Sequence, residues 1–472
     1  MDPVLSITVL SVLLGALIAL VFFKSYFSKR RSEVQSIAEP ELQPDHKKKA
    51  AKSSQTISKK HHTKTHSHAS DKDQSKKHHP LDVNTLKGHG DAVTGLCFSS
   101  DGRSLATACA DGIVRVFKLE DALSKSFKFL RINLPAGGPP TAISFADDSI
   151  VVATHALSGS SLYMFGEEKT KTTNETKQQT KPEIKWEHHK VHEKRAILTL
   201  FGATASYGSA DGSTIIVSCS EGTDIKIWHG KSGKLCGSVD TNQLKNHMAA
   251  ISPNGRFLAA AAFTADVKVW EMVYSKDGSI KEVLSAMQLK GHKSAVTCLC
   301  FSPNSEQIIT ASKDGSIRIW NINVRYHLSE DPKTLKVVPI PLRADVALHY
   351  DHLCLSPDGR ILAASHGSTL QWLNLETGEL LDTADKAHDD VEGYRELHKF
   401  LLFRSLSVKS LKSLSDFDIF DFYPFELMAD CEITSLAWAP KTIPMGNEQK
   451  LVLATASVDK KVKLWVAPSL HT

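Results

Sequence analysis

The chain has 472 residues, which exceeds one average domain and suits one large repeat array with additional segments. Hydrophobic residues make up 41% of the sequence, enough for a buried core. The net charge of +5 is uneven, because residues 24–80 hold 14 Lys and Arg against 6 Asp and Glu, and the remainder is nearly neutral. A nearly neutral globular part argues against specific nucleic-acid binding, which needs a concentrated basic face.

Residues 4–23 are the first predicted element, a transmembrane helix. These residues carry no charge and are long enough to cross ~30 Å of hydrocarbon. A cleaved signal peptide is the alternative, but it would have a basic start and a shorter apolar core. The basic flank begins at Lys24, so the positive-inside rule predicts that the rest of the chain faces the cytosol. A glycosylation sequon at Asn174 opposes this orientation weakly, since it would matter only in a lumen.

Residues 24–78 are predicted to be a disordered linker rich in Lys and His. The segment is nearly free of large apolar residues, so it cannot bury enough surface to offset its chain entropy. Histidines recur between residues 46 and 79, but no fixed ligand geometry or cysteine accompanies them. A solvated tether is therefore favoured over a metal site, and its lysines are suited to contact anionic lipid headgroups.

Similar units recur at a period of about 40 residues, which is the range expected of propellers. The clearest units span 86–118 and 289–321, and a third ends at Trp465. Four weaker units end near Phe165, Trp228, Trp270 and Trp372. Each unit has the pattern of short antiparallel strands joined by turns that contain Asp, Asn or Gly. We therefore predict an all-β, seven-bladed β-propeller over residues 79–468.

The repeated Gly-His, turn Asp and final Trp resemble the WD40 family. In that family a His, a Ser or Thr, an Asp and a Trp form a buried hydrogen-bonded chain within a blade, and a buried Asp needs such partners. The resemblance assigns this set to three blades: His292, Thr310, Asp314 and Trp320; His388, Thr455, Asp459 and Trp465; and His89, Thr107 and Asp111, with Phe117 in place of Trp. In the third and fourth blades Asp224 and Asp266 lie four residues before Trp, not six, and the sixth blade has no turn Asp. We expect apolar packing to hold those blades.

Residues 240–292 resemble the transducin β-like protein 2 family more specifically. The order of hydrophobic segment, basic linker and propeller agrees with that family. The resemblance implies residence in the endoplasmic reticulum membrane and a scaffold role in protein-quality or stress signalling. WD40 propellers usually complete the last blade with a strand from the other end of the chain, and residues 79–86 are expected to supply it.

Residues 391–430 interrupt the seventh blade with a segment rich in Phe and Leu. Three interpretations compete: a partner-binding insertion, a short amphipathic helix that covers the propeller, and translated intron sequence from an incorrect gene prediction. Under the first interpretation, an exposed aromatic patch would bind a partner through Phe417, Phe420, Phe422 and Tyr423.

Cysteine usage and catalytic motifs point to no cofactor, metal or enzymatic activity. The eight cysteines form no CxxC pair and have no zinc-ligand spacing, so buried reduced thiols are expected. Hydrolase, metalloprotease and phosphate-binding motifs are also missing from the sequence. His188, His189 and His192 cluster at the start of the third blade, where the fold itself needs a histidine.

The sequence therefore predicts a scaffold that docks protein partners. The alternative is an enzyme or transport factor that uses the propeller channel, which would need convergent polar residues with shifted pKa values. Lys313 and Val458 each precede a turn Asp, on the face that WD40 proteins often use for partners. They are the candidate binding residues, and plain solvated surface is the competing interpretation.

Overall fold

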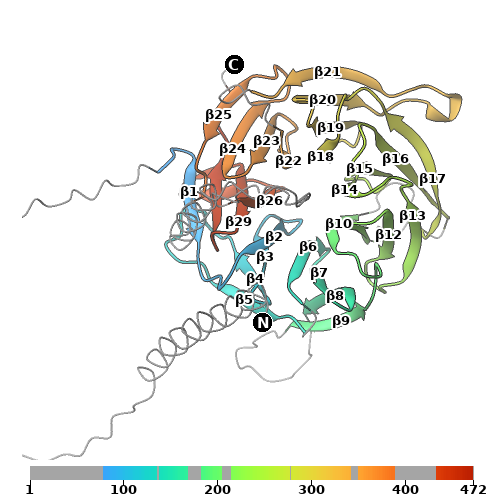
Figure 1. Ribbon diagram of the computed structural model, residues 1–472. Helices are drawn as coiled ribbons and strands as arrows, with labels where there is room; N and C mark the ends of the chain where they lie inside the picture. The colour runs from blue at the N-terminus through green and yellow to red at the C-terminus, as the bar shows by residue number, and fades with distance from the viewer. Residues whose placement is uncertain are drawn as a thin grey trace, which may run out of the picture. The chain divides into compact units, whose positions relative to one another are not determined.

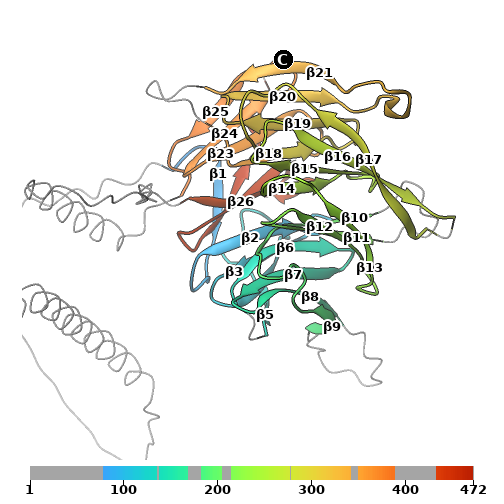
Figure 2. The same ribbon diagram turned by 45° about the vertical axis from the view of Figure 1, so that its right-hand side comes forward.

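The computed structural model describes residues 78–135, 138–167, 182–204, 214–276, 278–341, 349–388 and 432–470. These residues form seven four-stranded antiparallel sheets arranged as blades around a central axis (Figure 1), and Figure 2 shows the same ring in an oblique view. The predicted all-β, seven-bladed propeller is confirmed. The predicted membrane segment 4–23, the insertion 391–430 and nearly all of the linker 24–78 lie outside the described residues. Within the described ranges, no helix has the length and apolar character needed to cross a membrane.

The first four blades follow each other in chain order, and the innermost strand of each comes first. Blade 1 contains β2 (Val93–Phe98), β3 (Ser104–Cys109), β4 (Ile113–Lys118) and β5 (Phe129–Asn133). Blade 2 contains β6 (Pro140–Ala146), β7 (Ser149–Ala156), β8 (Gly159–Glu167) and β9 (Pro182–His188). Blade 3 contains β10 (Ile197–Thr204), β11 (Thr214–Ser220), β12 (Asp224–His229) and β13 (Leu235–Asp240). Blade 4 contains β14 (Asn246–Ile251), β15 (Phe257–Ala262), β16 (Val267–Tyr274) and β17 (Ile280–Leu289).

The last three blades complete the ring, and the seventh includes the first strand of the chain. Blade 5 contains β18 (Val296–Phe301), β19 (Gln307–Ser312), β20 (Ser316–Asn321) and β21 (Lys333–Pro339), with the 3-10 turn η1 (Tyr326–Leu328) before β21. Blade 6 contains β22 (His352–Leu355), β23 (Ile361–His366), β24 (Thr369–Asn374) and β25 (Leu380–Ala384). Blade 7 contains β26 (Ile433–Trp438), β29 (Val452–Ser457), β30 (Val462–Val466) and β1 (Asp82–Leu86), with the hairpin β27 (Ile443–Met445) and β28 (Glu448–Lys450) between β26 and β29.

The hydrophobic core lies between neighbouring blades. Every residue of β3, β11, β15 and β29 is buried, because each of these second strands is packed on both faces. Their small side chains, such as the four alanines of β15, allow neighbouring sheets to approach closely. One cluster joins blades 6 and 7 through Trp372 and Trp465, whose ring centroids are 5.7 Å apart. The ring is therefore held by apolar contacts repeated from blade to blade.

Strand β1 closes the ring, as the WD40 resemblance implies. It pairs antiparallel with β30, so the two ends of the propeller share one sheet. Leu86 is 1% exposed in the cluster between blades 7 and 1. The buried Nζ of Lys463 lies 3.0 Å from the Asp82 carboxylate across the same seam. The seam thus combines backbone pairing, an apolar anchor and a buried ion pair.

Candidate partner-binding face

Blades 5 and 7 contain complete hydrogen-bonded tetrads. In blade 5, Nε2 of His292 lies 2.8 Å from Oγ1 of Thr310, and its Nδ1 lies 2.9 Å from Oδ2 of Asp314. Nε1 of Trp320 donates to the same threonine hydroxyl at 2.9 Å. Burial acts to raise the pKa of Asp314, but hydrogen bonds from Ser316, the Lys293 amide and His292 outweigh it and lower this pKa to about 2. Each tetrad therefore ties the turn after the second strand to the blade's interior.

The tetrad of blade 7 has the same geometry. His388 contacts Thr455 Oγ1 at 2.8 Å and Asp459 Oδ2 at 3.0 Å. Trp465 donates to the hydroxyl of Thr455 at 2.9 Å. The side chains of His388 and Asp459 are 0% and 2% exposed, so the pair is shielded from solvent.

Blade 1 has only part of a tetrad. Nε2 of His89 lies 2.9 Å from Thr107, but its Nδ1 is buried with no hydrogen-bond partner among the described residues. Asp111 instead accepts hydrogen bonds from Arg115 at 2.8 and 3.2 Å, and Phe117 supplies no indole donor. Burial and the neighbouring charge of Arg115 lower the pKa of His89 to about 4. The arginine has replaced the histidine as partner of the turn Asp.

Blade 3 has a complete tetrad, so the expectation that apolar packing alone holds it is wrong. His192 contacts Asp224 through Nδ1 and Ser218 through Nε2, and Trp228 donates to the same serine at 3.0 Å. The strand registers explain the unusual spacing. Cys219 pairs with Ile225 in blade 3 as Ala311 pairs with Ile317 in blade 5, so Asp224 occupies the position of Ser316. The carboxylate reaches the histidine from the first residue of β12 rather than from the turn.

Blades 4 and 6 have no such chain among the described residues. In blade 4, Gln243 takes the place of the histidine and donates to Thr264 at 2.8 Å. In blade 6, the indole nitrogen of Trp372 is buried without a hydrogen-bond partner in the described ranges. These two blades therefore depend on apolar packing to a greater extent.

The tetrads lie near one surface of the ring, which we call the front face. It is the face on which the innermost strand of each blade begins and on which the turn after the second strand lies. Seven residues directly follow the second strands and form a ring on this face: Ala110, Leu157, Glu221, Phe263, Lys313, Gly367 and Val458. Of the two predicted binding residues, Lys313 is exposed and Val458 is half-buried. The aromatic residues predicted as a patch, Phe417, Phe420, Phe422 and Tyr423, lie outside the described residues.

Large apolar side chains are exposed on the front face at blades 2 and 4. Leu157, Leu244 and Phe263 are 102%, 88% and 50% exposed. The ring of Phe263 lies 4.2 Å from that of His247, between centroids. Burial, and then the positive charges of Lys313 and Lys245, lower the pKa of His247. We call Leu244, His247, Phe263 and Lys313 the front patch.

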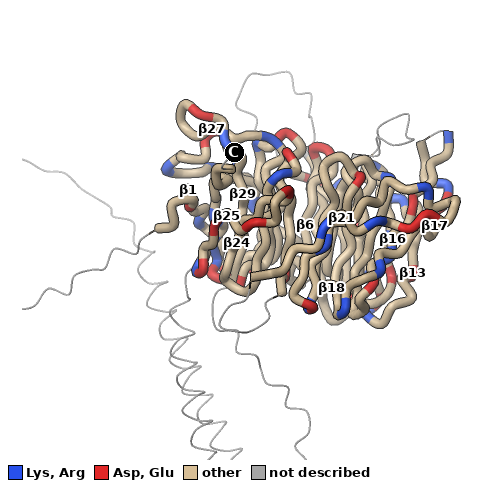
Figure 3. Tube along the Cα trace, turned by 90° about the horizontal axis from the view of Figure 1, so that it is seen from above, with Lys and Arg blue, Asp and Glu red and all other residues tan. Residues whose placement is uncertain are grey.

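The front patch combines apolar surface with an adjacent cation. Sequence reasoning identified Lys313 but missed Phe263, although both residues directly follow the second strand of a blade. Applying that register to every blade would have found Phe263 and Leu157. Elsewhere on the ring, Lys and Arg positions are interspersed with Asp and Glu positions (Figure 3). The apolar exposure of the front patch, not its charge, therefore distinguishes it.

The innermost strands line a central cavity of about 790 Å³. Its wall includes the thiols of Cys97, Cys300 and Cys354. Burial raises the pKa of all three thiols, to about 11 for Cys354. A nucleophilic cysteine needs a lowered pKa, so these three thiols are not activated.

Comparison with known proteins agrees with the architecture. The family model "WD domain, G-beta repeat" matches residues 81–118 and 284–321. Transducin beta-like protein 2 of Homo sapiens is 31% identical over 312 residues, which cover 66% of this chain and 66% of the human protein. The Mus musculus protein of the same name is 31% identical over 66% of this chain and 67% of its own length. Apoptotic protease-activating factor 1 of Rattus norvegicus is 28% identical, over 34% of this chain and 12% of that protein. With its seven blades, its tetrads and these matches, the chain belongs to the WD40-repeat family of transducin beta-like protein 2.

Proposed function

We propose that this chain is a membrane-tethered scaffold that docks a partner protein on the front patch. The observation that carries the proposal is the exposure of Leu244 and Phe263 on blade 4 beside Lys313, whose turn in blade 5 is held by a tetrad. WD40 propellers generally bind proteins, and rigid turns that present apolar side chains reduce the entropy lost on binding. An aromatic residue with an apolar neighbour and an adjacent cation has the composition of an interface hot spot.

The outer circumference of the propeller provides the comparison surface. Exposed apolar residues also occur there, such as Leu335 and Val337 on β21, at 54% and 49% exposure. These two side chains belong to an edge strand, and isolated exposed apolar residues are common on protein surfaces. They form a matched control, because their removal deletes a similar kind of exposed apolar surface away from the front patch.

The docking proposal is tested by quantitative affinity capture of the full-length protein. Leu244→Ala with Phe263→Ala should lose specific partners by about tenfold or more, which corresponds to about 1.4 kcal/mol. Leu335→Ala with Val337→Ala should retain them. Equal capture by both double variants would contradict docking on the front patch.

The proposed tether consists of residues 4–23 and the basic linker. An uncharged 20-residue segment followed by Lys24 and further cations supports an anchor with the propeller in the cytosol. The lysines of residues 24–78 support contact with anionic headgroups. The family resemblance supports the endoplasmic reticulum as the membrane, and protein-quality or stress signalling as the process.

Deletion of residues 1–31 tests the anchor directly. The truncated protein should move from the membrane pellet to the supernatant after alkaline carbonate washing, whereas the full chain should stay in the pellet. A circular dichroism spectrum should show the β-structure retained. A truncated, folded protein that remained in the carbonate-washed membranes would refute the single-anchor model.

A further inference from the structure

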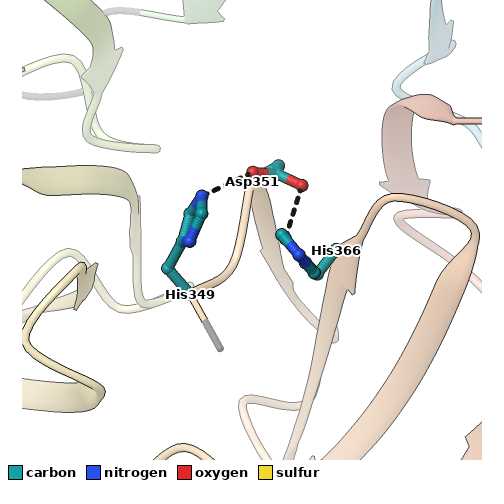
Figure 4. A group of neighbouring side chains, drawn as sticks. All are labelled: His349, Asp351 and His366. Atoms are coloured by element: carbon teal, nitrogen blue, oxygen red, sulfur yellow. Dashed lines mark hydrogen bonds and ion pairs between the residues drawn. The ribbon is translucent and has the colours of Figure 1, made fainter. Parts of the chain in front are cut away.

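Blade 6 places three potential metal ligands together on the front face. His349 and Asp351 lie just before β22, and His366 ends β23 (Figure 4). Nε2 of His349 lies 3.4 Å from Oδ1 of Asp351, and Nδ1 of His366 lies 3.0 Å from Oδ2 of the same carboxylate. The ligand atoms of the three residues all lie within 4.8 Å of one another.

These separations fit a small tetrahedral cation. Zinc bonds of about 2.1 Å to nitrogen or oxygen in a tetrahedron hold the ligand atoms about 3.4 Å apart. The two histidines contact different oxygens of Asp351, and one ligand atom from each of the three residues lies within 4.8 Å of the other two, so each separation needs to shorten by about 1.4 Å at most. Two imidazoles with one carboxylate favour Zn²⁺ over Mg²⁺ or Ca²⁺, which prefer oxygen ligands alone.

Exposure distinguishes this cluster from the structural histidines of the tetrads. The side chains of His292 and His388 are 1% and 0% exposed. The side chains of His349, Asp351 and His366 are 31%, 28% and 35% exposed. An ion can therefore reach the cluster from solvent. Blade 6 also lacks a tetrad, so the fold does not require this arrangement of histidines.

Glu432 of the neighbouring blade supplies a second carboxyl group near the cluster. Glu432 directly precedes β26 of blade 7. The Ile433 amide donates a hydrogen bond to the Gly367 carbonyl at 2.9 Å, which places Glu432 next to the segment that carries His366. Glu432 is therefore a further potential oxygen ligand beside the two imidazoles and Asp351.

We propose that His349, Asp351 and His366 bind a zinc-class divalent cation on the front face, with water or Glu432 completing the coordination. The ion would link the residues before β22 to the end of β23 within blade 6. A position open to solvent would also let a carboxylate or imidazole of a docked partner coordinate the metal. Zinc binding itself is independent of any partner.

The test measures zinc binding by the full-length protein. The linker histidines could bind zinc unspecifically, so the parent protein carries asparagine at six positions: His46, His61, His62, His66, His68 and His78. After treatment with a chelator and equilibrium dialysis against Zn²⁺, metal analysis should find one zinc per chain. His349→Gln and His366→Gln should each weaken binding about tenfold or more. His327→Gln, which alters an exposed histidine on η1, should have no effect.

A second measurement needs no variant of the site. Bound zinc should protect His349 and His366 of the parent from a histidine-acylating reagent, as read by peptide mass spectrometry, while His327 stays reactive. Mg²⁺ at the same concentration should give no protection. A parent that binds no zinc, or unchanged binding in both Gln variants, would overturn the proposal, as would equal modification of all three histidines with and without zinc.

Discussion

The hydroxyl of Thr310 is the centre of the blade 5 tetrad, and its removal should be costly. Thr310→Val nearly preserves the shape of the side chain but deletes the partner of His292 Nε2 at 2.8 Å and of Trp320 Nε1 at 2.9 Å. Thr310 is 0% exposed, so water cannot replace the hydroxyl. Each buried polar group left without a partner costs about 1–3 kcal/mol, so for these two groups we expect the free energy of unfolding to fall by about 2–6 kcal/mol.

Thr154 in β7 is a matched control. It is also 0% exposed, but its hydroxyl has no hydrogen-bond partner among the described residues. Thr154→Val should therefore be neutral or slightly stabilising. Urea unfolding of the detergent-solubilised full chain, followed by tryptophan fluorescence, measures both variants. With a slope of about 3 kcal/mol/M, a loss of about 3 kcal/mol lowers the midpoint by about 1 M. Equal midpoints for the two variants would refute the stabilising role of the tetrad.

Two further predictions concern the charge of Asp314 and the closure of the ring by β1. The pKa of Asp314 is lowered from 3.8 to about 2 in the folded state, so its contribution of about 2 kcal/mol is complete above pH 4 and is lost as pH falls toward 2. Asp314→Asn should remove that part of the pH dependence, and an unchanged stability–pH curve between pH 4 and 2 would contradict the assignment. Leu86→Ala should lower the free energy of unfolding by about 2–5 kcal/mol, because it leaves a cavity at the closing seam. Calorimetry should compare Leu86→Ala with Leu335→Ala, which alters an exposed leucine. Similar losses of unfolding free energy in both variants would argue against closure by β1.

The overall architecture could be predicted because each repeat contains the sequence pattern of one complete blade. The spacing of the final Trp and the turn Asp in the units at 86–118 and 289–321 reflects strand length and turn type within one blade. The closing strand was predicted from the WD40 resemblance, which implies that residues 79–86 complete the last blade. The blade repeats depend on residues near each other in sequence, whereas the closing strand joins the two ends of the propeller.

The tetrads were predicted less completely, because small changes in register alter which side chains meet. In blade 3 the carboxylate moved by two positions, so a search for Asp six residues before Trp missed Asp224. In blade 1 the motif residues are present, but Arg115 binds Asp111 and leaves one nitrogen of His89 without a partner among the described residues. Competition between Arg115 and His89 for one carboxylate depends on side-chain geometry that a motif does not contain.

The candidate sites on the front face were the least accessible from sequence. Leu244 and Phe263 occur in turns, and only the structure shows that their side chains are exposed. The cluster of His349, Asp351 and His366 combines two separate segments and lacks the spacing of a metal-binding motif. Folding brings these residues together because the start of the first strand and the end of the second strand of a blade lie on the same face.

Site-specific photo-crosslinking in intact membranes tests docking on the front patch most directly. A photoreactive amino acid replaces Phe263 in one version of the full-length protein and Leu335 in another, so that the front patch and the outer circumference are compared in the same protein. We predict discrete protein adducts from position 263 that disappear with Leu244→Ala, and none of these adducts from position 335. The same adducts from both positions, or adducts from position 335 alone, would contradict partner docking on the front patch.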